Sequence, residues 1–545
     1  MSTYNTLKTR LENTDQLHLL HFWNELTNEE KNNFASQLDS INFEDVNDLF
    51  RDAIRSLEED TKKLDNRMKP VPESQFESEE TSTPETLERY NNIGLEQIAN
   101  NRVGVLLLAG GQGTRLGVTY PKGMYCVGLP SGKTLFQIQA ERIRKVEELA
   151  NKGTNKNGNI VWYIMTSGPT EEATENFLKS NNFFGLRPEN VVQFDQGLLP
   201  CFDMEGHILL ESKNKVSLAP DGNGGIYRAL REKGILRDMK RRGIRYLHVH
   251  SVDNILVKVA DPVFIGYCVD KKADCGAKVV KKASPSEAVG VVCQVDGRFQ
   301  VVEYSEITDA TANLRDKEGN LVFSSGNICN HYFSTDFLNE IADKHENKLK
   351  LHVAKKKISF INENGDRVKP EKPNGIKIEK FVFDVFQFSD HFVTWEVPRH
   401  IEFSALKNSN DVGRDCPSTS RKDLFTLHKK YVDAAGGTVL GEVVEISPLV
   451  SYAGENLAPF VEGKTLSAPF SFNQIFGNVP QLQFLNRNQK LSQEFGLSEA
   501  TVHAVVTLGE QLICSIDFGE FMVIPVILYP MYRGCIDVDV LAPHN

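Results

Sequence analysis

The feature that most constrains the fold is a short, wholly apolar run from Val103 to Leu108, followed at once by a glycine-rich loop. Such a run is typical of a strand that is buried on both faces of a sheet. Similar runs follow at 160–165 and 191–194, with helical periodicity between them and a helix start near Pro169. This alternation predicts right-handed βαβ units, and therefore an α/β fold with a doubly wound, mostly parallel sheet. Ligands of such sheets bind at the carboxyl ends of the strands.

Helices are expected before this sheet. Thr27 and Glu30 have the spacing of a capping box, and apolar residues recur at helical spacing from Val46 to Leu57. From 70 to 86 the composition shifts to Pro, Ser, Thr and Glu, which predicts a mobile linker or surface loop. We therefore expect residues 1–100 to form an N-terminal helical region with an acidic linker.

Strands dominate after the predicted sheet. Beyond residue 270 the runs that favour strands lie at 290–295, 299–304, 328–333 and 377–383. A helix is expected from Ser420 to Gly436, and the remainder is expected to form short strands, among them 502–508 and 512–516. We therefore predict a central domain over 101–407 and a C-terminal helix with a small β-rich domain over 408–545.

Composition excludes several classes of partner. The 62 Lys and Arg residues against 73 Asp and Glu give a net charge of −11, which argues against a broad basic face for nucleic acid or an anionic membrane. The longest apolar run, 521–532, contains two prolines and is too short to span a bilayer. The first twenty residues lack a signal-peptide layout, and the nine cysteines include no C-x-x-C pair. We expect a cytoplasmic protein with reduced thiols; whether it is a monomer or a homodimer is not determined by sequence.

The loop after the first apolar run carries the strongest chemical signal. Gly110, Gly111 and Gly113 let the backbone approach a ligand closely and direct successive N–H groups at an anion. Arg115 and Lys122 add two cations to the same loop: arginine offers a planar fork and lysine a mobile point charge. The combination predicts a cradle for a polyphosphate.

Two other phosphate motifs do not fit this chain. A dinucleotide fingerprint needs glycine where Leu116 stands, three residues after Gly113. A P-loop needs four residues between its glycines, but only three separate Gly128 from the Gly132-Lys133-Thr134 sequence. The predicted cradle is therefore neither of the dinucleotide-binding nor of the P-loop type.

Together with the following Tyr120-Pro121-Lys122, this loop resembles the signature of eukaryotic UDP-N-acetylhexosamine pyrophosphorylases. Matches extend from about residue 90 to about 470, and the family's C-terminal pattern is still present at 447–455. After about residue 472 the ending is atypical for the family. The other matching segments are 219–225, 252–254, 289–293, 302–306, 375–383 and 403–408.

Several candidate ligands can also be read from the residues. The predicted strand 244–252 ends in Asp253, and one Asp beside a triphosphate is the usual way to hold Mg²⁺. His248 and His250 on the same strand lack a third ligand in sequence reach, which favours packing over a zinc pair. Gln196 can pair with a base edge through its amide.

The resemblance implies a role for a larger set of residues. It places Arg115, Lys122, Lys377 and Lys407 at the phosphates and Asp253 at Mg²⁺, with Mn²⁺ as a substitute. It also places the N-acetylhexosamine against Gly290, Glu303 and Asn327, with Phe381 and Phe383 closing one wall. The remaining residues expected to bind substrate are Leu108, Ala109, Gly110, Gly111, Gln196, Gly222, Asn223 and Tyr304.

The implied reaction joins UTP and N-acetylhexosamine 1-phosphate into UDP-N-acetylhexosamine and pyrophosphate. The sequence does not separate N-acetylglucosamine from N-acetylgalactosamine, because one epimeric hydroxyl is recognised by pocket shape. Three alternatives stay open: a UDP-glucose or broad UDP-sugar pyrophosphorylase, a glycosyltransferase, and a catalytically silent nucleotide-sugar binder. A glycosyltransferase usually carries Asp-x-Asp, whereas Asp253 is followed by Asn254 and Ile255.

Overall fold

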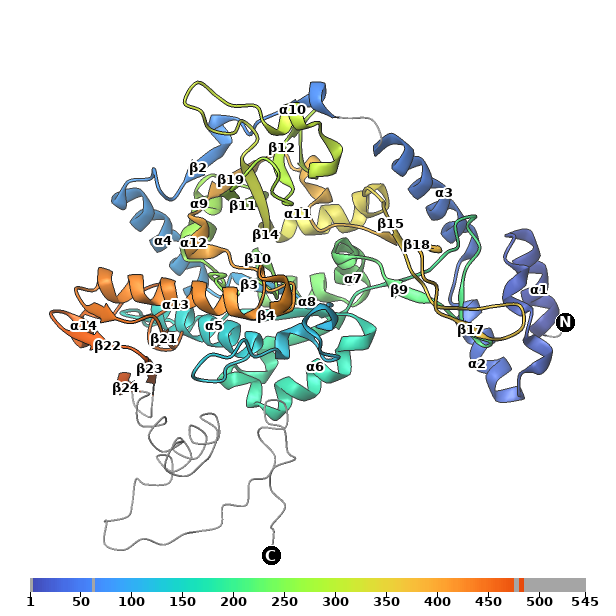
Figure 1. Cartoon of the computed structure of the whole chain (residues 1–545), viewed down its shortest axis with the longest axis horizontal. Coiled ribbons are helices and arrows are strands. Elements are labelled where there is room, and N and C mark those ends of the chain that lie inside the picture. Colours follow the sequence, from blue (N-terminus) through green and yellow to red (C-terminus); the bar gives the residue numbers. More distant parts are fainter. Residues whose placement is uncertain (1–2, 61–63, 475–479, 485–545) are drawn as a thin grey trace, which may run out of the picture.

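A central sheet of eleven strands organises the molecule, for which the computed structural model describes residues 3–60, 64–474 and 480–484 (Figure 1). Along its main path of eight strands, neighbours pair in parallel except at β14, which is antiparallel to both β10 and β11; the three strands off this path pair antiparallel. The predicted mostly parallel α/β fold is confirmed. In spatial order, the main path is β2 (Phe76–Ser78), β19 (Phe392–Glu396), β11 (Cys275–Lys281), β14 (Ser325–Ser334), β10 (Tyr246–Ser251), β3 (Val103–Leu108), β4 (Val161–Thr166) and β5 (Val191–Asp195). The strands off this path are β1 (Met68–Lys69), β12 (Val291–Val295) and β13 (Arg298–Val302).

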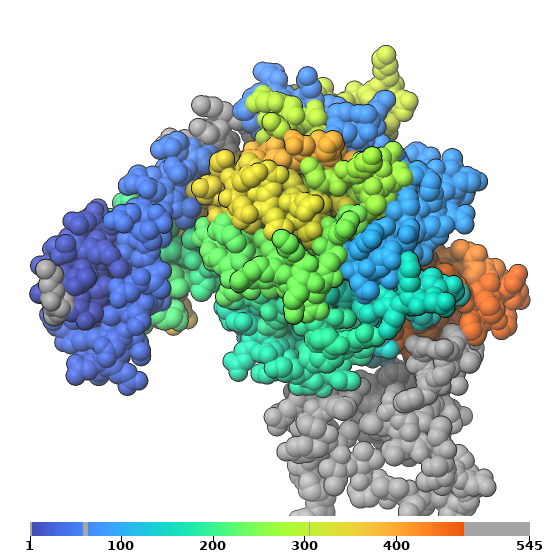
Figure 2. Space-filling model, turned by 180° about the vertical axis from the view of Figure 1, so that it is seen from behind, coloured from blue at the N-terminus to red at the C-terminus, as the bar shows by residue number. Residues whose placement is uncertain are grey.

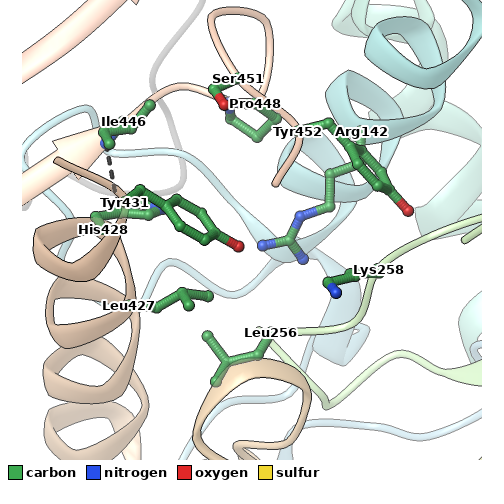
Figure 3. Close-up of a pocket in the computed structure, with 10 residues that line it drawn as sticks. All are labelled: Arg142, Leu256, Lys258, Leu427, His428, Tyr431, Ile446, Pro448, Ser451 and Tyr452. Carbon is green, nitrogen blue, oxygen red and sulfur yellow. Dashed lines mark hydrogen bonds between the residues drawn. The ribbon is translucent and has the colours of Figure 1, made fainter. Parts of the chain in front are cut away.

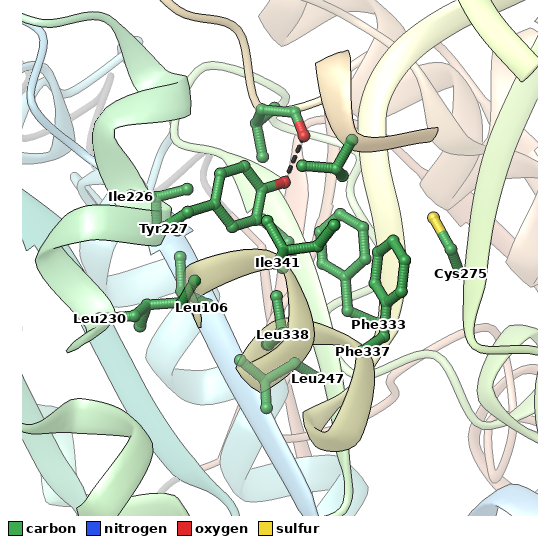
Figure 4. Packing of buried hydrophobic residues seen from close by; sticks show 14 of the residues in the cluster. Leu106, Ile226, Tyr227, Leu230, Leu247, Cys275, Phe333, Phe337, Leu338 and Ile341 are labelled. Atoms are coloured by element: carbon green, nitrogen blue, oxygen red, sulfur yellow. Dashed lines mark hydrogen bonds between the residues drawn. The ribbon is translucent and has the colours of Figure 1, made fainter. Parts of the chain in front are cut away.

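Helices cover both faces of this sheet because successive side chains of each strand point to opposite sides. Leu107 packs on one face against α4 (Pro84–Ala99), α5 (Leu135–Asn151), α6 (Gly168–Ser180) and α9 (Pro262–Asp270). Leu106 packs on the other face against α7 (Ile226–Glu232), α8 (Ile235–Arg242) and α11 (Thr335–Glu340). Figure 4 shows Tyr227 of α7 and Leu338 of α11 on this second face, near Leu106 and Leu247.

The N-terminal helices form a separate lobe at one side of the sheet (Figures 1 and 2). They are α1 (Thr3–Asn13), α2 (Asn28–Asp39) and α3 (Phe43–Asp60). The predicted capping box starts α2: the Thr27 N–H donates to Glu30 Oε2 at 2.8 Å, and the Glu30 N–H donates to Thr27 Oγ1 at 3.3 Å. Their apolar faces pack on two excursions of the central chain, at 198–218 and 351–378, through residues such as Phe202, Ile376 and Ile378.

These two excursions consist of small strand pairs. The strands of the first are β6 (Leu198–Pro200), β7 (Leu210–Ser212), β8 (Lys215–Val216) and β9 (Leu218–Pro220). Those of the second are β15 (His352–Lys356), β16 (Phe360–Ile361), β17 (Arg367–Val368) and β18 (Gly375–Glu379). The backbone of Phe202 forms a bridge with that of Ile376, so the two excursions lie side by side.

Three local predictions are corrected by the structure. The segment 70–86 is not only a linker, because β2 pairs with β19 as an edge strand, where short and polar sequences are tolerated. The strand expected over 377–383 ends at Glu379, since side chains of Asp384 and Asn223 take the next amides out of the ladder. The helix expected from Ser420 is α13 (Pro417–Ala434), with Cys416 at its N-cap and proline at its first position.

The chain after α13 forms a small module against the central domain (Figure 1). Its elements are β20 (Thr438–Leu440), β21 (Val444–Ile446), α14 (Ala458–Val461), β22 (Thr465–Ser467), β23 (Phe470–Gln474) and β24 (Pro480–Phe484). The strands predicted at 502–508 and 512–516, and the apolar run at 521–532, lie outside the described residues. None of the described helices combines the length and the apolar character needed to cross a membrane.

Candidate active site

The loop after β3 folds back on itself at the carboxyl edge of the sheet. The Gly113 N–H donates to the Tyr120 carbonyl at 3.1 Å, and the Lys122 N–H donates to the Gly111 carbonyl at 3.2 Å. A Cβ at Gly113 would lie 2.3 Å from Val118 Cγ2, so a larger residue there would displace the Val118 side chain. Among the described residues, no hydrogen bond is made by the amides of Gly111, Gln112, Thr114 and Arg115. These amides can therefore receive an anion.

Three segments that are distant in sequence meet beside this loop. Lys122 Nζ lies 3.8 Å from Asp253 Oδ2 and donates to the Leu406 carbonyl at 3.2 Å. The Leu406 N–H donates to the Asp253 carbonyl at 2.8 Å, which places Lys407 next to the pair. Arg115 and Lys407 are both exposed. We call Arg115, Lys122, Asp253 and Lys407 the phosphate cluster.

Asn254 holds these segments in place, although sequence reasoning did not identify it as a site residue. Its Oδ1 accepts the Ser404 N–H at 3.0 Å and the Leu256 N–H at 3.2 Å, while its Nδ2 donates to the Glu402 carbonyl at 2.7 Å. The residue is 3% exposed. Its side chain thus clamps the segment that carries Lys407 against the turn that carries Asp253.

A second support comes from Arg142, which is buried in α5. Its guanidinium donates to the carbonyls of Ile255 at 2.7 Å and Val257 at 2.9 Å, fixing the turn after Asp253. Beside it, a cavity of about 10 Å³ has room for a single water molecule. Figure 3 shows the Arg142 guanidinium between Tyr431 of α13 and Lys258. This cavity is a structural feature of the domain junction rather than a substrate pocket.

A buried ion network lies beneath the phosphate cluster. Lys278 Nζ of β11 contacts Asp261 Oδ2 at 2.6 Å and Glu402 Oε2 at 2.7 Å, and Lys258 Nζ is 3.2 Å from Glu402 Oε1. The side chains of Lys278 and Glu402 are both 0% exposed. Burial opposes the charge of Asp261, but the ammonium groups of Lys278 and Lys258 outweigh it and hold its pKa below the ordinary value. Glu402 connects this network to the backbone held by Asn254.

Gln196 lies between the glycine-rich loop and segment 221–225. Its Nε2 donates to the Gly222 carbonyl at 2.9 Å and to Asp221 Oδ1 at 3.2 Å. A Cβ at Gly110 would lie 2.6 Å from Gln196 Oε1, so the glutamine packs directly on the glycine-rich loop. Burial raises the pKa of Asp221 to about 6, although the hydrogen bond from Gln196 acts in the opposite direction.

The turn after β18 is fastened to the glycine-rich segment 221–225. The Lys380 N–H donates to the Asp221 carbonyl at 2.8 Å, the Gly224 N–H donates to the Lys380 carbonyl at 2.8 Å, and the Val382 N–H donates to Asn223 Oδ1 at 2.9 Å. Gly222 adopts φ +85°, and a Cβ there would lie 2.4 Å from the Lys380 carbonyl oxygen. The turn presents Phe381 and Phe383 as a pair of rings with centroids 5.2 Å apart. We call this turn, 380–384, the aromatic turn.

The three residues predicted to contact the sugar lie together. The Asn327 N–H donates to the Gly290 carbonyl at 2.8 Å, and a Cβ at Gly290 would lie 2.9 Å from Glu303 Oε1. Burial and the neighbouring Glu306 raise the pKa of Glu303, while His352 and Lys407 lower it. The charge of Lys407 therefore connects this pocket to the phosphate cluster.

The remaining predicted residues occupy less definite positions. Leu108 and Ala109 are buried, so they can offer only backbone to a ligand. Tyr304 is 54% exposed. Lys377 of β18 pairs in register with Ala354, and burial raises the pKa of the nearby Cys201 thiol while Lys377 lowers it. The contacts of the described residues do not join Lys377 to the phosphate cluster.

Asp253 is the one residue predicted to hold a metal ion. No group of three or more His, Cys, Asp and Glu side chains that could hold a metal occurs within the described ranges. His248 and His250 are buried and stacked with centroids 5.5 Å apart, and burial lowers the pKa of both, in keeping with packing. A single carboxylate beside an anion cradle suits Mg²⁺, which keeps several waters and takes phosphate oxygens as ligands.

Free loop amides, two lysines and one carboxylate at the carboxyl edge of a mostly parallel sheet, near polar and aromatic side chains, are the features expected of a nucleotidyltransferase of the sugar-pyrophosphorylase class. The model of the UTP–glucose-1-phosphate uridylyltransferase family matches residues 44–452. Human UDP-N-acetylhexosamine pyrophosphorylase-like protein 1 is 48% identical over 505 residues, covering 89% of this chain and 100% of that protein. The UDP-N-acetylglucosamine pyrophosphorylase of Saccharomyces cerevisiae is 40% identical over 458 residues, covering 82% and 94%.

Solved structures agree. The uridine diphosphate N-acetylglucosamine pyrophosphorylase from Trypanosoma brucei, crystallised with an inhibitor, superposes with a TM-score of 0.73 at 29% identity, covering 86% of this chain and 99% of that one. The putative UDP-N-acetylglucosamine pyrophosphorylase from Entamoeba histolytica gives a TM-score of 0.69 at 38% identity, covering 74% and 99%. The chain belongs to the UDP-N-acetylhexosamine pyrophosphorylase family.

Proposed function

We propose that this protein transfers the uridylyl group of UTP to N-acetylhexosamine 1-phosphate, forming UDP-N-acetylhexosamine and pyrophosphate. The observation that carries the proposal is the continuous arrangement from the phosphate cluster, through Lys407, to the pocket of Gly290, Glu303 and Asn327. That arrangement offers unpaired loop amides and exposed cations to an anion at one end and hydrogen-bonding groups to a sugar at the other. The named relatives support the same substrates.

The reaction needs no nucleophile from the protein, because an oxygen of the sugar phosphate attacks the α-phosphorus of UTP in line and pyrophosphate leaves. The protein must hold two anions together and neutralise the charge of the transition state. Arg115, Lys122 and the unpaired amides of the glycine-rich loop act on the phosphates of UTP and on the leaving pyrophosphate. Lys407 holds the sugar phosphate, and Lys377 supports the α-phosphate.

Asp253 is the residue that would hold Mg²⁺, or Mn²⁺ in its place. The ion would supply charge neutralisation at the phosphate oxygens. Lys122 Nζ lies 3.8 Å from the same carboxylate, so this ion pair holds the Asp253 side chain beside the cradle.

Base and sugar are recognised by residues outside the phosphate cluster. Gln196, Gly222 and Asn223, with the backbone of Leu108 and Ala109, form the surface for uracil and ribose. Gly290, Glu303 and Asn327 face the N-acetylhexosamine, with Tyr304 beside them, and Phe381 and Phe383 close one wall. We place the reaction in the cytoplasm, since nine cysteines without any C-x-x-C pair favour reduced thiols.

Pyrophosphate release from UTP, Mg²⁺ and a panel of sugar 1-phosphates tests the proposal. We expect release with N-acetylglucosamine or N-acetylgalactosamine 1-phosphate, and much less with glucose 1-phosphate. Faster release with glucose 1-phosphate would identify a UDP-glucose or broad UDP-sugar pyrophosphorylase instead. Binding of UDP-sugar without any release would identify a catalytically silent binder.

A further inference from the structure

His352 lies behind the aromatic turn and has no role in the proposed chemistry so far. Its Nε2 is 3.1 Å from both carboxylate oxygens of Asp384. Its ring stacks on Phe381 with centroids 4.1 Å apart and an interplanar angle of 28°. The Asp384 side chain is 6% exposed and that of His352 is 19% exposed, so the pair is largely shielded from solvent.

The hydrogen bonds define how the imidazole is held. A carboxylate can only accept, so Nε2 carries the proton and donates to Asp384. Asp384 Oδ2 also accepts the Phe381 N–H at 2.8 Å, so one carboxylate fixes both the imidazole and the backbone of the aromatic turn. A histidine whose ring nitrogen is held by a carboxylate has a fixed orientation. The ring that it presents to Phe381 is therefore fixed as well.

The aromatic turn thus has two independent attachments. Segment 221–225 holds one side through the amides of Lys380, Gly224 and Val382. On the other side, His352 stacks on Phe381 and donates from Nε2 to Asp384, and Phe381 is the residue that the proposed function places against the sugar. Nucleotide and sugar therefore depend on different attachments of the same turn.

We infer that His352 is a positioning residue for the N-acetylhexosamine moiety: oriented by Asp384, it fixes Phe381 as the wall of the sugar pocket. The inference rests on the proposed function and deepens it, since it assigns sugar selectivity to a residue outside the matched motifs. Loss of His352 frees the Phe381 ring but leaves the bonds of Gly224 and Asn223 intact. The effect falls on the sugar and spares the uridine nucleotide.

Binding without turnover tests this directly. Dissociation constants of UDP-N-acetylglucosamine and of UDP are measured by calorimetry for wild type, His352→Asn, His352→Phe and Asp384→Asn. The first variant keeps a polar amide and loses the ring; the second keeps a stacking ring and loses the donor. We expect each to bind UDP-N-acetylglucosamine about tenfold more weakly, the size of one lost charge-assisted hydrogen bond or aromatic contact, with UDP binding within about twofold.

His391→Asn is the matched control, because His391 is exposed and its contact with Asp274 is made by its backbone. It should leave both constants unchanged. Equal weakening of UDP and UDP-N-acetylglucosamine by the His352 variants would overturn the inference and indicate a general structural role. Unchanged binding of both ligands would overturn it too.

A double-mutant cycle separates positioning from direct contact. If His352 acts through Phe381, His352→Phe should add little to Phe381→Leu, so the two effects on UDP-N-acetylglucosamine binding should be far from additive. Additive effects would contradict action through Phe381. Because these are binding measurements, a wild type that binds UDP-N-acetylglucosamine but releases no pyrophosphate would refute the proposed function and leave the inference on His352 standing.

Discussion

The candidate site has two ends that are built in different ways: the phosphate cluster, and the aromatic turn with the residues expected to bind base and sugar. At the phosphate end, Arg115 and Lys407 are exposed, and Lys122 makes one carbonyl contact and one ion pair at 3.8 Å. At the base and sugar end, the amides of three consecutive residues of the aromatic turn, Lys380, Phe381 and Val382, are hydrogen-bonded before any substrate binds. Charge at one end is loosely held, whereas shape at the other is preorganised.

This difference assigns separate tasks to the two ends. Mobile cations can follow phosphates from UTP to pyrophosphate as the charge moves, and their contribution appears in turnover. A preformed pocket distinguishes one sugar from another, and its contribution appears in affinity. The phosphate cluster is nevertheless supported by a rigid element, the buried ion network of Lys278, Asp261 and Glu402.

The largest expected effect concerns this buried ion network. Lys278→Met leaves Glu402 and Asp261 buried with one fewer cation, which should lower the free energy of unfolding by about 3–5 kcal/mol. Urea denaturation measures this. Lys281→Met is the control on the same strand, since its side chain is 63% exposed and 3.8 Å from Glu396. Equal stability of the two variants would show that the buried ion network around Lys278 does not stabilise the fold.

Removing a cation from the phosphate end should act on turnover instead. Lys122→Ala and Arg115→Ala should each lower kcat by roughly 10²–10³, the loss typical of one group that stabilises developing charge. The free energy of unfolding should change little. Steady-state pyrophosphate release measures the effect, with Lys348→Ala as an exposed control outside the cluster. Near-wild-type turnover in both variants would show that the cradle is wrongly assigned.

Asp221, beside the residues expected to bind the uracil base, is a charged group whose ionisation should lower the stability of the fold. Burial raises the pKa of Asp221 to about 6 from an ordinary value of 3.8, so the folded protein favours the neutral acid. Below about pH 4 folded and unfolded chains are both protonated; as pH rises through 6, the folded state loses stability relative to the unfolded chain.

Asp221→Asn should therefore be more stable than wild type at pH 8, by up to about 3 kcal/mol, with the difference vanishing below pH 4. The amide keeps an acceptor for Gln196, so the geometry is preserved. Urea denaturation at pH 4, 6 and 8 measures the trend. A difference that is constant with pH would mean that Asp221 ionises normally.

Loss of a single attachment of the aromatic turn should have a moderate effect. Asn223→Ala removes the acceptor of the Val382 N–H and leaves that amide without its partner. This should lower the free energy of unfolding by about 1–3 kcal/mol. We expect weaker binding of UDP-N-acetylglucosamine and of UDP together, unlike the selective effect of the His352 variants. Calorimetry with both ligands measures this. An effect on one ligand alone would contradict the separation between the attachment through Asn223 and the attachment through His352.

The smallest effect is expected at Tyr304. The ring is 54% exposed beside Glu303, and substitutions at such positions usually change free energies by no more than about 0.5 kcal/mol. Tyr304→Ala should alter the KM for the sugar phosphate by no more than about twofold. A larger increase would place Tyr304 among the residues that close over the bound sugar.

Sequence was informative where local pattern and chemistry coincide. The run 103–108 identified β3 to the residue, because a fully buried strand has a continuous apolar pattern. The glycine-rich loop and its cations could be predicted as an anion cradle because such a cradle requires those residue types within a few positions. Both signals are contained in one short segment.

The supports of the site carry no such signal. Asn254 acts on residues about 150 positions away, and His352 lies in an ordinary lysine-rich strand, yet it meets Asp384 and Phe381. The aromatic turn was predicted as strand because Phe381 and Phe383 alternate correctly, but its amides are taken by side chains and by segment 221–225. Only tertiary structure reveals such partners.

The N-terminal lobe has a consequence for how the protein is made. Helices α1 to α3 leave the ribosome before the elements that cover them, and part of their apolar cover, Ile376 and Ile378, is encoded roughly 300 residues later. At about 5–20 residues per second, those helices wait roughly 15–60 s with an uncovered apolar face. We expect the nascent lobe to be a substrate for chaperones, released when β18 emerges and the lobe gains its partner strand.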